Sequence, residues 1–106
     1  MALEIQVVVA TTPCARLRGL IGRPCPTPGT GFLLQPAASV HTCFMRYPID
    51  VVFLDRDGRV LSVHHGLPPW RMRAHRGARA VLELRAGEAR RLMIEPGKLA
   101  PCCSSQ

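Results

Sequence analysis

The stretch IDVVFLDRDGRVLSV, residues 49–63, carries the most decisive fold signal in this chain of 106 residues. Residues 49–55 form a nearly continuous apolar run, which is typical of a central strand buried on both faces. A turn follows at 55–58, where Gly58 accommodates a positive φ, and residues 60–63 return as a second strand. The stretch therefore predicts a β-hairpin.

Outside this hairpin, the apolar and β-branched runs at 3–9, 31–35, 40–46 and 80–84 predict further short strands. Thr12 followed by Pro13 predicts the start of a helix, because a hydroxyl can cap the free amides and proline suits the first turn. This predicted helix ends at Gly22. A second, short helix is expected at 87–93. The fold class is therefore mainly β (α+β by count): a compact β-sandwich or distorted barrel with one main N-terminal helix and a short C-terminal one.

Length and composition predict one domain at 1–101 followed by a frayed tail at 102–106. The net charge is +7, and Lys98 is the only lysine among the basic residues. A GC-rich coding sequence can produce that arginine bias, and acidic partners such as nucleic acid are the functional alternative. The five cysteines are odd in number and irregularly spaced. An odd cysteine count without a recognisable signal peptide predicts reduced thiols and a cytoplasmic location. No apolar run is long enough to span a bilayer, so no membrane partner is expected.

Charged side chains gather in the sequence around the corner formed by residues 47–48. We expect Arg46, Asp50, Trp70, Glu83 and an arginine of the predicted helix to line a small polar cleft. Such a cleft suits a non-catalytic binding or accessory module for a small ligand or a protein partner. The alternative is that Asp50 and Glu83 form structural ion pairs that lock the hairpin to its neighbour, since a carboxylate buried alone is costly.

The segment 70–79 suggests a second function, because it places arginines beside the only tryptophan of the chain. Such a loop can stack bases and track phosphates, which predicts contacts with RNA or DNA. The alternative is a solvated loop in which Trp70 packs inward as an anchor. The predicted nucleic-acid contacts are Arg71, Arg73, Arg76 and Arg79.

A third alternative is a metal-binding or hydrolytic enzyme. If 40–46 is a strand, His41, Cys43 and Met45 share a face, and His64 or His65 could complete a set of ligands for copper or zinc. The opposing interpretation is that Cys43 and Met45 are ordinary core residues. No hydrolase, phosphate-loop, dinucleotide or metalloprotease motif occurs, so no catalytic residue, cofactor or metal is predicted from motifs.

Three segments in order resemble a bacterial and archaeal family known as the domain of unknown function numbered 192. They are RLRGLIGR at 16–23, Met45 followed by PIDVVFLD at 48–55, and LELRAG at 82–87. The chain departs from the family pattern at Ile21, where methionine is usual, in a shorter segment between Met45 and Pro48, and at Lys98, where aspartate is usual. The resemblance implies a compact β-sandwich or barrel-like fold with one main helix, and it implies no activity.

Overall fold

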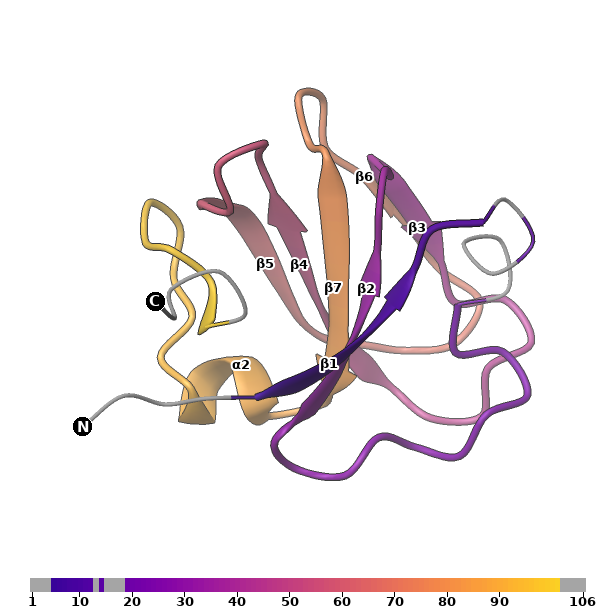
Figure 1. Ribbon diagram of the computed structural model, residues 1–106. Helices are drawn as coiled ribbons and strands as arrows, with labels where there is room; N and C mark the ends of the chain where they lie inside the picture. The colour runs from indigo at the N-terminus through magenta and orange to yellow at the C-terminus, as the bar shows by residue number, and fades with distance from the viewer. Residues whose placement is uncertain (1–4, 13, 15–18, 102–106) are drawn as a thin grey trace.

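The computed structural model describes residues 5–12, 14 and 19–101 of the chain. These residues form a mainly β fold in which two sheets and one short helix pack together (Figure 1). The elements are β1 (Gln6–Ala10), β2 (Thr30–Leu34), β3 (Ser39–His41), β4 (Ile49–Leu54), β5 (Val60–Leu67), β6 (Met72–Ala74), β7 (Ala80–Arg85) and α2 (Glu88–Arg91).

The main sheet has five strands in the order β1-β2-β7-β4-β5, and β3 pairs with β6 in a separate two-stranded sheet. β1 and β2 run parallel, whereas all other pairs are antiparallel. β7 lies at the centre although it is the last strand in the sequence (Figure 1). No closed barrel forms within the described residues, and the predicted mainly β class is confirmed in the form of two sheets.

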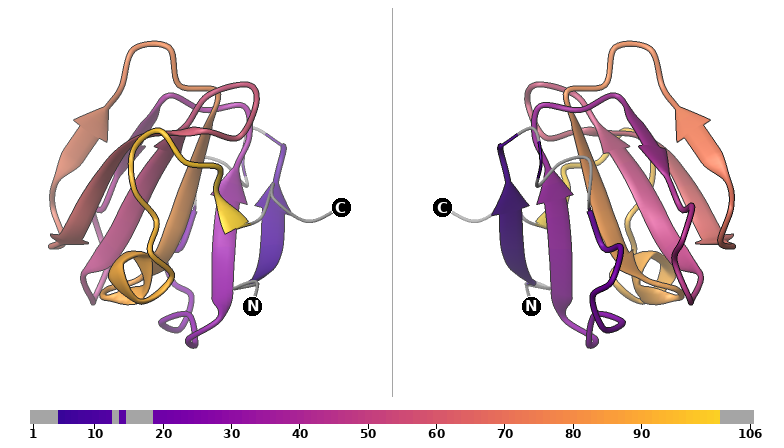
Figure 2. Two further views of the ribbon diagram at one scale, coloured as in Figure 1. Left: turned by 90° about the vertical axis from the view of Figure 1, so that its left-hand side faces the viewer. Right: turned by 90° about the vertical axis from the view of Figure 1, so that its right-hand side faces the viewer.

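Both faces of the main sheet are covered, because β4 and β7 bury alternate apolar side chains on each side. The face that we call the pocket face carries Phe32, Val51, Phe53 and Val81, and it packs against Leu20 and the segment around Met45. The opposite face, the helix face, carries Val52, Leu54, Leu82 and Leu84 and packs against Ala89, Leu92 and Ile94. Figure 2 shows α2 and its following segment on one side of the sheet and the 19–29 segment on the other.

The predicted hairpin is confirmed, because β4 and β5 pair antiparallel across the turn at 55–58. The Oδ1 atom of Asp55 accepts hydrogen bonds from the backbone N–H groups of Asp57 and Arg59, at 2.8 and 2.9 Å. Gly58 has a φ of 84°, the left-handed conformation that the sequence predicts there. A local turn with a side-chain acceptor and a glycine thus joins two apolar strands.

The predicted helix at 12–22 can be checked only in part, because residues 13 and 15–18 lie outside the described residues. From Gly19 to Gly22 the chain forms turns, so the prediction is wrong for this portion. Gly19 has a φ of 53° and Gly22 a φ of 75°, and neither value fits a right-handed helix. The predicted tail at 102–106 also lies outside the described residues.

The boundaries of three further regions differ from the prediction. The strand expected at 40–46 ends at His41, because the backbone turns at Thr42 and Phe44 adopts a φ of 69°. β5 runs on to Leu67, beyond the expected residues 60–63, and the loop expected at 70–79 is interrupted because residues 72–74 form β6 against β3. The helix expected at 87–93 is reduced to the single turn α2. Among the described residues, no helix is long and apolar enough to cross a membrane.

Candidate functional site

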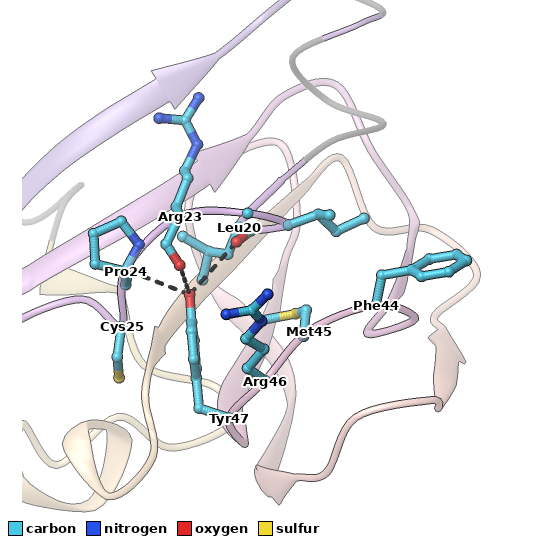
Figure 3. A pocket seen from close by; sticks show the side chains of 10 residues that line it. Leu20, Arg23, Pro24, Cys25, Phe44, Met45, Arg46 and Tyr47 are labelled. Carbon is cyan, nitrogen blue, oxygen red and sulfur yellow. Dashed lines mark hydrogen bonds between the residues drawn. The ribbon is translucent and has the colours of Figure 1, made fainter.

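A pocket of about 430 Å³ opens on the pocket face, between two segments that are far apart in the sequence. Ligand sites typically fall in this range of size, so the pocket is large enough for a small organic molecule. Figure 3 shows the two walls facing each other, one from residues 20–25 and the other from residues 44–47. The lining residues are Leu20, Ile21, Gly22, Arg23, Pro24, Cys25, Phe44, Met45, Arg46 and Tyr47.

Tyr47 ties the two walls together. Its hydroxyl lies 3.1 Å from the carbonyl oxygen of Arg23, 3.3 Å from that of Pro24 and 3.5 Å from that of Leu20 (Figure 3). Burial raises the pKa of Tyr47 above its ordinary value, and the nearby Cys25 and Glu83 raise it further. The phenol therefore stays protonated at neutral pH and donates a hydrogen bond to the 20–25 segment.

Two arginines are among the residues that line the pocket, and their side chains lie in different environments. The guanidinium of Arg23 sits 5.0 Å from the ring centre of Phe32, and its Nε donates to the carbonyl oxygen of Gly19 at 3.1 Å. Arg23 is thus held by a cation–π contact and a backbone bond. Arg46 is exposed, and Figure 3 shows its side chain directed toward the opposite wall. Arg46 is therefore the cation that a ligand in the pocket can reach.

Glu83 lies beneath the pocket, in the middle of the apolar pocket face. It pairs in register with Phe32 and Val51 on the neighbouring strands and is only 1% exposed. Its Oε1 atom has no hydrogen-bond partner among the residues that the structure describes. A Cβ atom built on Gly19 would lie 3.2 Å from this oxygen, so the glycine lets the turn before Leu20 rest directly on the carboxyl group.

Burial in this apolar setting raises the pKa of Glu83 from 4.5 to about 8. The carboxyl group is therefore mostly protonated at neutral pH. In that state it adds no negative charge to oppose Arg23 and Arg46. A protonated carboxyl also carries an O–H donor, so the group buried beneath the pocket is neutral and polar.

Asp50 is also fully buried, yet it points to the helix face and not to the pocket. Its Oδ1 accepts a hydrogen bond from Gly66 N at 2.8 Å, and its Oδ2 accepts from Gly87 N at 3.0 Å and Ala89 N at 2.9 Å. The predicted cleft therefore does not include Asp50. Asp50 and Glu83 come from adjacent strands but alternate to opposite sides of the sheet.

The alternative prediction of structural ion pairs is not met by the described residues either. The salt bridges found there join Arg91 to Glu88 and Lys98 to Glu95, both away from the pocket. Asp50 binds backbone N–H groups instead of a guanidinium. Its role in the structure is to fix the start of α2 and the end of β5.

Trp70 does not pack inward as an anchor. The residue is 59% exposed, and its ring lies 4.7 Å from that of Phe44, which is 69% exposed. Phe44 lines the outer end of the pocket, and Trp70 lies just beyond it. Of the four predicted cleft residues, Arg46 lines the pocket, Glu83 lies below it, Trp70 lies beside it and Asp50 lies on the far face.

The four arginines predicted to contact nucleic acid are not one cluster. Arg71 follows Trp70 directly, and Arg73 lies on β6, two residues further. Arg79 donates its backbone N–H to the carbonyl of Leu54, at the end of β4. Trp70 follows β5, whose last residue, Leu67, pairs with Ile49 at the start of β4, so Arg79 and Trp70 lie near opposite ends of β4. Arg76 is exposed in the turn between these two regions. Only Arg71 and Arg73 therefore adjoin the aromatic pair.

The metal-site hypothesis loses its geometric basis, because residues 42–46 do not continue strand β3. His41 accepts a hydrogen bond at its Nδ1 from the backbone N–H of Cys43 at 3.2 Å, and Met45 is buried in the core of the pocket face. Within the described residues, no group of three histidine, cysteine or acidic side chains is placed to hold a metal ion.

Arg46 and Glu83 are predicted at this site, and Arg23 fits the predicted contribution of an arginine from the segment of the predicted helix, whereas Tyr47 and Cys25 are not predicted as pocket residues. Their roles depend on contacts made more than 20 positions along the chain, such as that between Tyr47 and Arg23. The one signal in the sequence was the Tyr47–Pro48 corner, because a tyrosine held at a turn can brace a neighbouring loop.

Two solved structures share most of this fold. One is a protein of unknown function from Novosphingobium aromaticivorans DSM 12444, with a TM-score of 0.79 and 27% identity, covering 88% of this chain and 71% of that one. The other is described as a putative transcription regulator from Sinorhizobium meliloti 1021, with a TM-score of 0.78 and 28% identity, covering 86% of this chain and 76% of that one. No curated protein matches the chain.

The comparison with protein families is more specific. The model of DUF192, described as "Uncharacterized ACR, COG1430", matches residues 1–100, which is nearly the whole chain. The segments that build the pocket, 20–25 and 44–47, and Glu83 beneath it lie within or beside the three motifs that carry the family resemblance. This chain therefore belongs to the DUF192 family.

Proposed function

We propose that the protein is a binding module whose pocket takes a small anionic ligand with an apolar body. The observation that carries the proposal is the composition of the lining: the charged side chains among the lining residues are Arg23 and Arg46, and most of the others are apolar. A concave apolar site with a few placed polar groups is the usual form of a small-molecule site. Arg46 would bind the anionic group, since a guanidinium pairs well with carboxylate or phosphate.

Two further features support an anionic ligand over a neutral or cationic one. Protonation of the buried Glu83 leaves the two arginine charges uncompensated at neutral pH. The hydroxyl of Tyr47 is already engaged with backbone carbonyls of the opposite wall, so it joins the two walls and is not a free ligand group. Leu20, Ile21 and Met45 would then contact the apolar body of the ligand.

Thermal-shift screening of small carboxylates and phosphates with aliphatic or aromatic bodies tests this proposal. A ligand present at one hundred times its dissociation constant stabilises the native state by about 2.7 kcal/mol, which raises the melting temperature of a domain of this size by about 10 °C. Arg46→Gln is expected to weaken binding roughly 10-fold or more, because it removes a charge-assisted pair. The matched control is Arg90→Gln, an exposed arginine of α2 on the other face. Equal shifts in the two variants, or a preference for neutral compounds, would contradict the proposal.

The affinity for the ligand is also expected to depend on pH. As pH rises through about 8, Glu83 loses its proton and places a negative charge under the pocket. Binding of an anion should weaken over this range in the wild-type protein. In Glu83→Gln the decline should disappear, because glutamine does not ionise. Isothermal titration at several pH values measures this effect, and parallel pH profiles for the two proteins would exclude the part assigned to Glu83.

A further inference from the structure

Phe44 and Trp70 form an exposed aromatic pair beside the pocket, which we call the aromatic platform, and the exposed Met72 follows at the start of β6. Phe44 and Met72 are each 69% exposed and Trp70 is 59% exposed. The two rings meet at 4.7 Å with an interplanar angle of 59°. Figure 3 shows Phe44 projecting away from the other pocket residues. Large side chains gathered in this way on a surface are typical of binding sites.

The backbone holds both aromatic residues in an unfavourable conformation. Phe44 has a φ of 69° and Trp70 a φ of 66°, a region that bulky side chains rarely adopt. The buried Thr42 fixes both positions, because its carbonyl oxygen accepts from Met45 N at 3.2 Å and from Trp70 N at 3.1 Å. Its Oγ1 accepts from Arg71 N at 2.8 Å and donates to the carbonyl of Pro68 at 2.7 Å. Strained backbone conformations cluster at functional sites, so the positive φ values at these two exposed aromatic residues indicate that their rings have a function.

The charge around the aromatic platform has a single sign. The chain has no aspartate or glutamate from residue 5 to residue 49 or from residue 58 to residue 82, and these two segments contain the whole platform. Arg46 lies two residues after Phe44, and Arg71 directly follows Trp70, with its Nη1 donating to the Trp70 carbonyl at 3.4 Å. Arg73 follows Met72 on β6. A partner that matches this surface carries many negative charges and flat apolar groups.

We propose that the aromatic platform binds a single-stranded polynucleotide. Each nucleotide brings one flat base and one phosphate, which match the exposed rings and the adjoining arginines respectively. In a duplex the base faces are covered by their neighbours, so the rings could stack only on a single strand. The site goes beyond the proposed pocket function, since Trp70, Arg71 and Arg73 do not line the pocket. An acidic peptide has the negative charges but lacks a flat group on every residue. Binding of such a peptide in place of a polynucleotide is the competing outcome of the test.

Trp70 is the only tryptophan in the chain, so its fluorescence reports directly on this surface. Titration with uridine and thymidine dodecamers at low salt should quench Trp70 emission and raise the anisotropy of end-labelled strands. The two strands distinguish RNA from DNA as the source of the single strand. The matching duplex should bind more weakly and quench less. Affinity should fall with rising salt, because binding releases counterions from the phosphates.

Substitutions at the platform can remove the rings without loss of the fold. Asparagine adopts positive φ more readily than phenylalanine or tryptophan, so Phe44→Asn and Trp70→Asn should unfold within a few degrees of the wild type. Each is expected to weaken binding of the labelled strand roughly 10-fold or more. Met93→Asn is the matched control, because Met93 has a φ of 56°, is 61% exposed and follows α2 on the helix face. It should bind like the wild type.

The arginines give an independent measurement. Replacing both Arg71 and Arg73 with alanine should reduce the slope of log affinity against log salt concentration by about 1 for each phosphate that the variant no longer binds. Arg90→Ala on α2 should leave the slope unchanged. The proposal is overturned if neither dodecamer quenches Trp70 at low salt, if Trp70→Asn and Met93→Asn bind alike, or if a glutamate- and phenylalanine-rich peptide binds and the strands do not. The Trp70→Asn protein should still respond to a pocket ligand, so the two proposals can fail separately.

Discussion

Replacing Glu83 with glutamine is expected to raise the free energy of unfolding by about 3 kcal/mol at pH 7 and to leave it unchanged near pH 4. The unfolded chain releases the proton of Glu83 above its ordinary pKa of 4.5, whereas the folded protein retains the proton until about pH 8. Between these values the unfolded state binds fewer protons, so stability falls by about 1.4 kcal/mol for each pH unit. Glutamine has no proton to lose, and its stability should not show this decline.

Urea unfolding followed by circular dichroism between about pH 4 and pH 9 measures the difference. The wild-type and Glu83→Gln curves should diverge steadily up to about pH 8 and run parallel above it. Glu95→Gln is the control, because Glu95 is exposed and forms only an exposed pair with Lys98 at 3.4 Å. That variant should stay within about 0.5 kcal/mol of the wild type throughout. Wild-type and Glu83→Gln curves that stay parallel from pH 5 to pH 8 would contradict the raised pKa.

A carboxyl group that lowers stability at neutral pH needs a reason to be retained. Proteins commonly hold unfavourable groups at sites where activity depends on them. In this protein the same protonated carboxyl keeps the net charge beneath the pocket at zero, which suits the anionic ligand that we propose. The stability measurement and the pH dependence of ligand binding therefore examine one property of Glu83 by two routes.

The hairpin could be predicted from the sequence because every contact that defines it is local. The side chain of Asp55 bonds to amides two and four residues away, and Gly58 provides the positive φ of the turn. A continuous apolar run at 49–54 requires cover on both faces wherever its partners come from in the sequence. These features need no knowledge of distant segments.

The predicted cleft could not be obtained in the same way, because the direction of a buried side chain depends on register. Asp50 and Glu83 lie on paired strands, and a shift of one position would place them on the same face. The pairing of β4 with β5 also contains irregularities between residues 49 and 51 and between residues 53 and 54. The sequence contains both carboxylates but not the information that separates them.

The error at Gly19 and the outward position of Trp70 have a similar origin. The residues around Gly19 predict a helix, yet Gly19 lies in a turn with a φ of 53°. It packs on the carboxyl group of Glu83, which lies 64 positions further along the chain. Trp70 adopts a positive φ because its amide donates to the carbonyl of Thr42, which follows β3 and lies 28 positions earlier in the chain. In both cases a tertiary contact outweighs the local preference.

Asp50→Asn is expected to destabilise the protein by about 3 kcal/mol or more. Asp50 satisfies three backbone amides: Gly66 through one oxygen, and Gly87 and Ala89 through the other. Asparagine keeps only one oxygen, so its NH₂ group must face at least one of these N–H donors. A buried amide left without an acceptor costs about 1 to 3 kcal/mol, and the bonds that remain lose the contribution of the carboxylate charge.

The consequence extends beyond a single hydrogen bond because Asp50 connects three elements. Gly87 begins α2 with a φ of 95° and no side-chain cap of its own, so Asp50 provides the acceptor from β4. Gly66, with a φ of 59°, is held at the end of β5 by the same carboxylate. Amide hydrogen exchange should therefore accelerate at Ala89 and Gly66 together in Asp50→Asn. The exposed Asp57→Asn should change stability by less than about 0.5 kcal/mol. Similar unfolding curves for the two variants would show that Asp50 does not hold α2 and β5 in place.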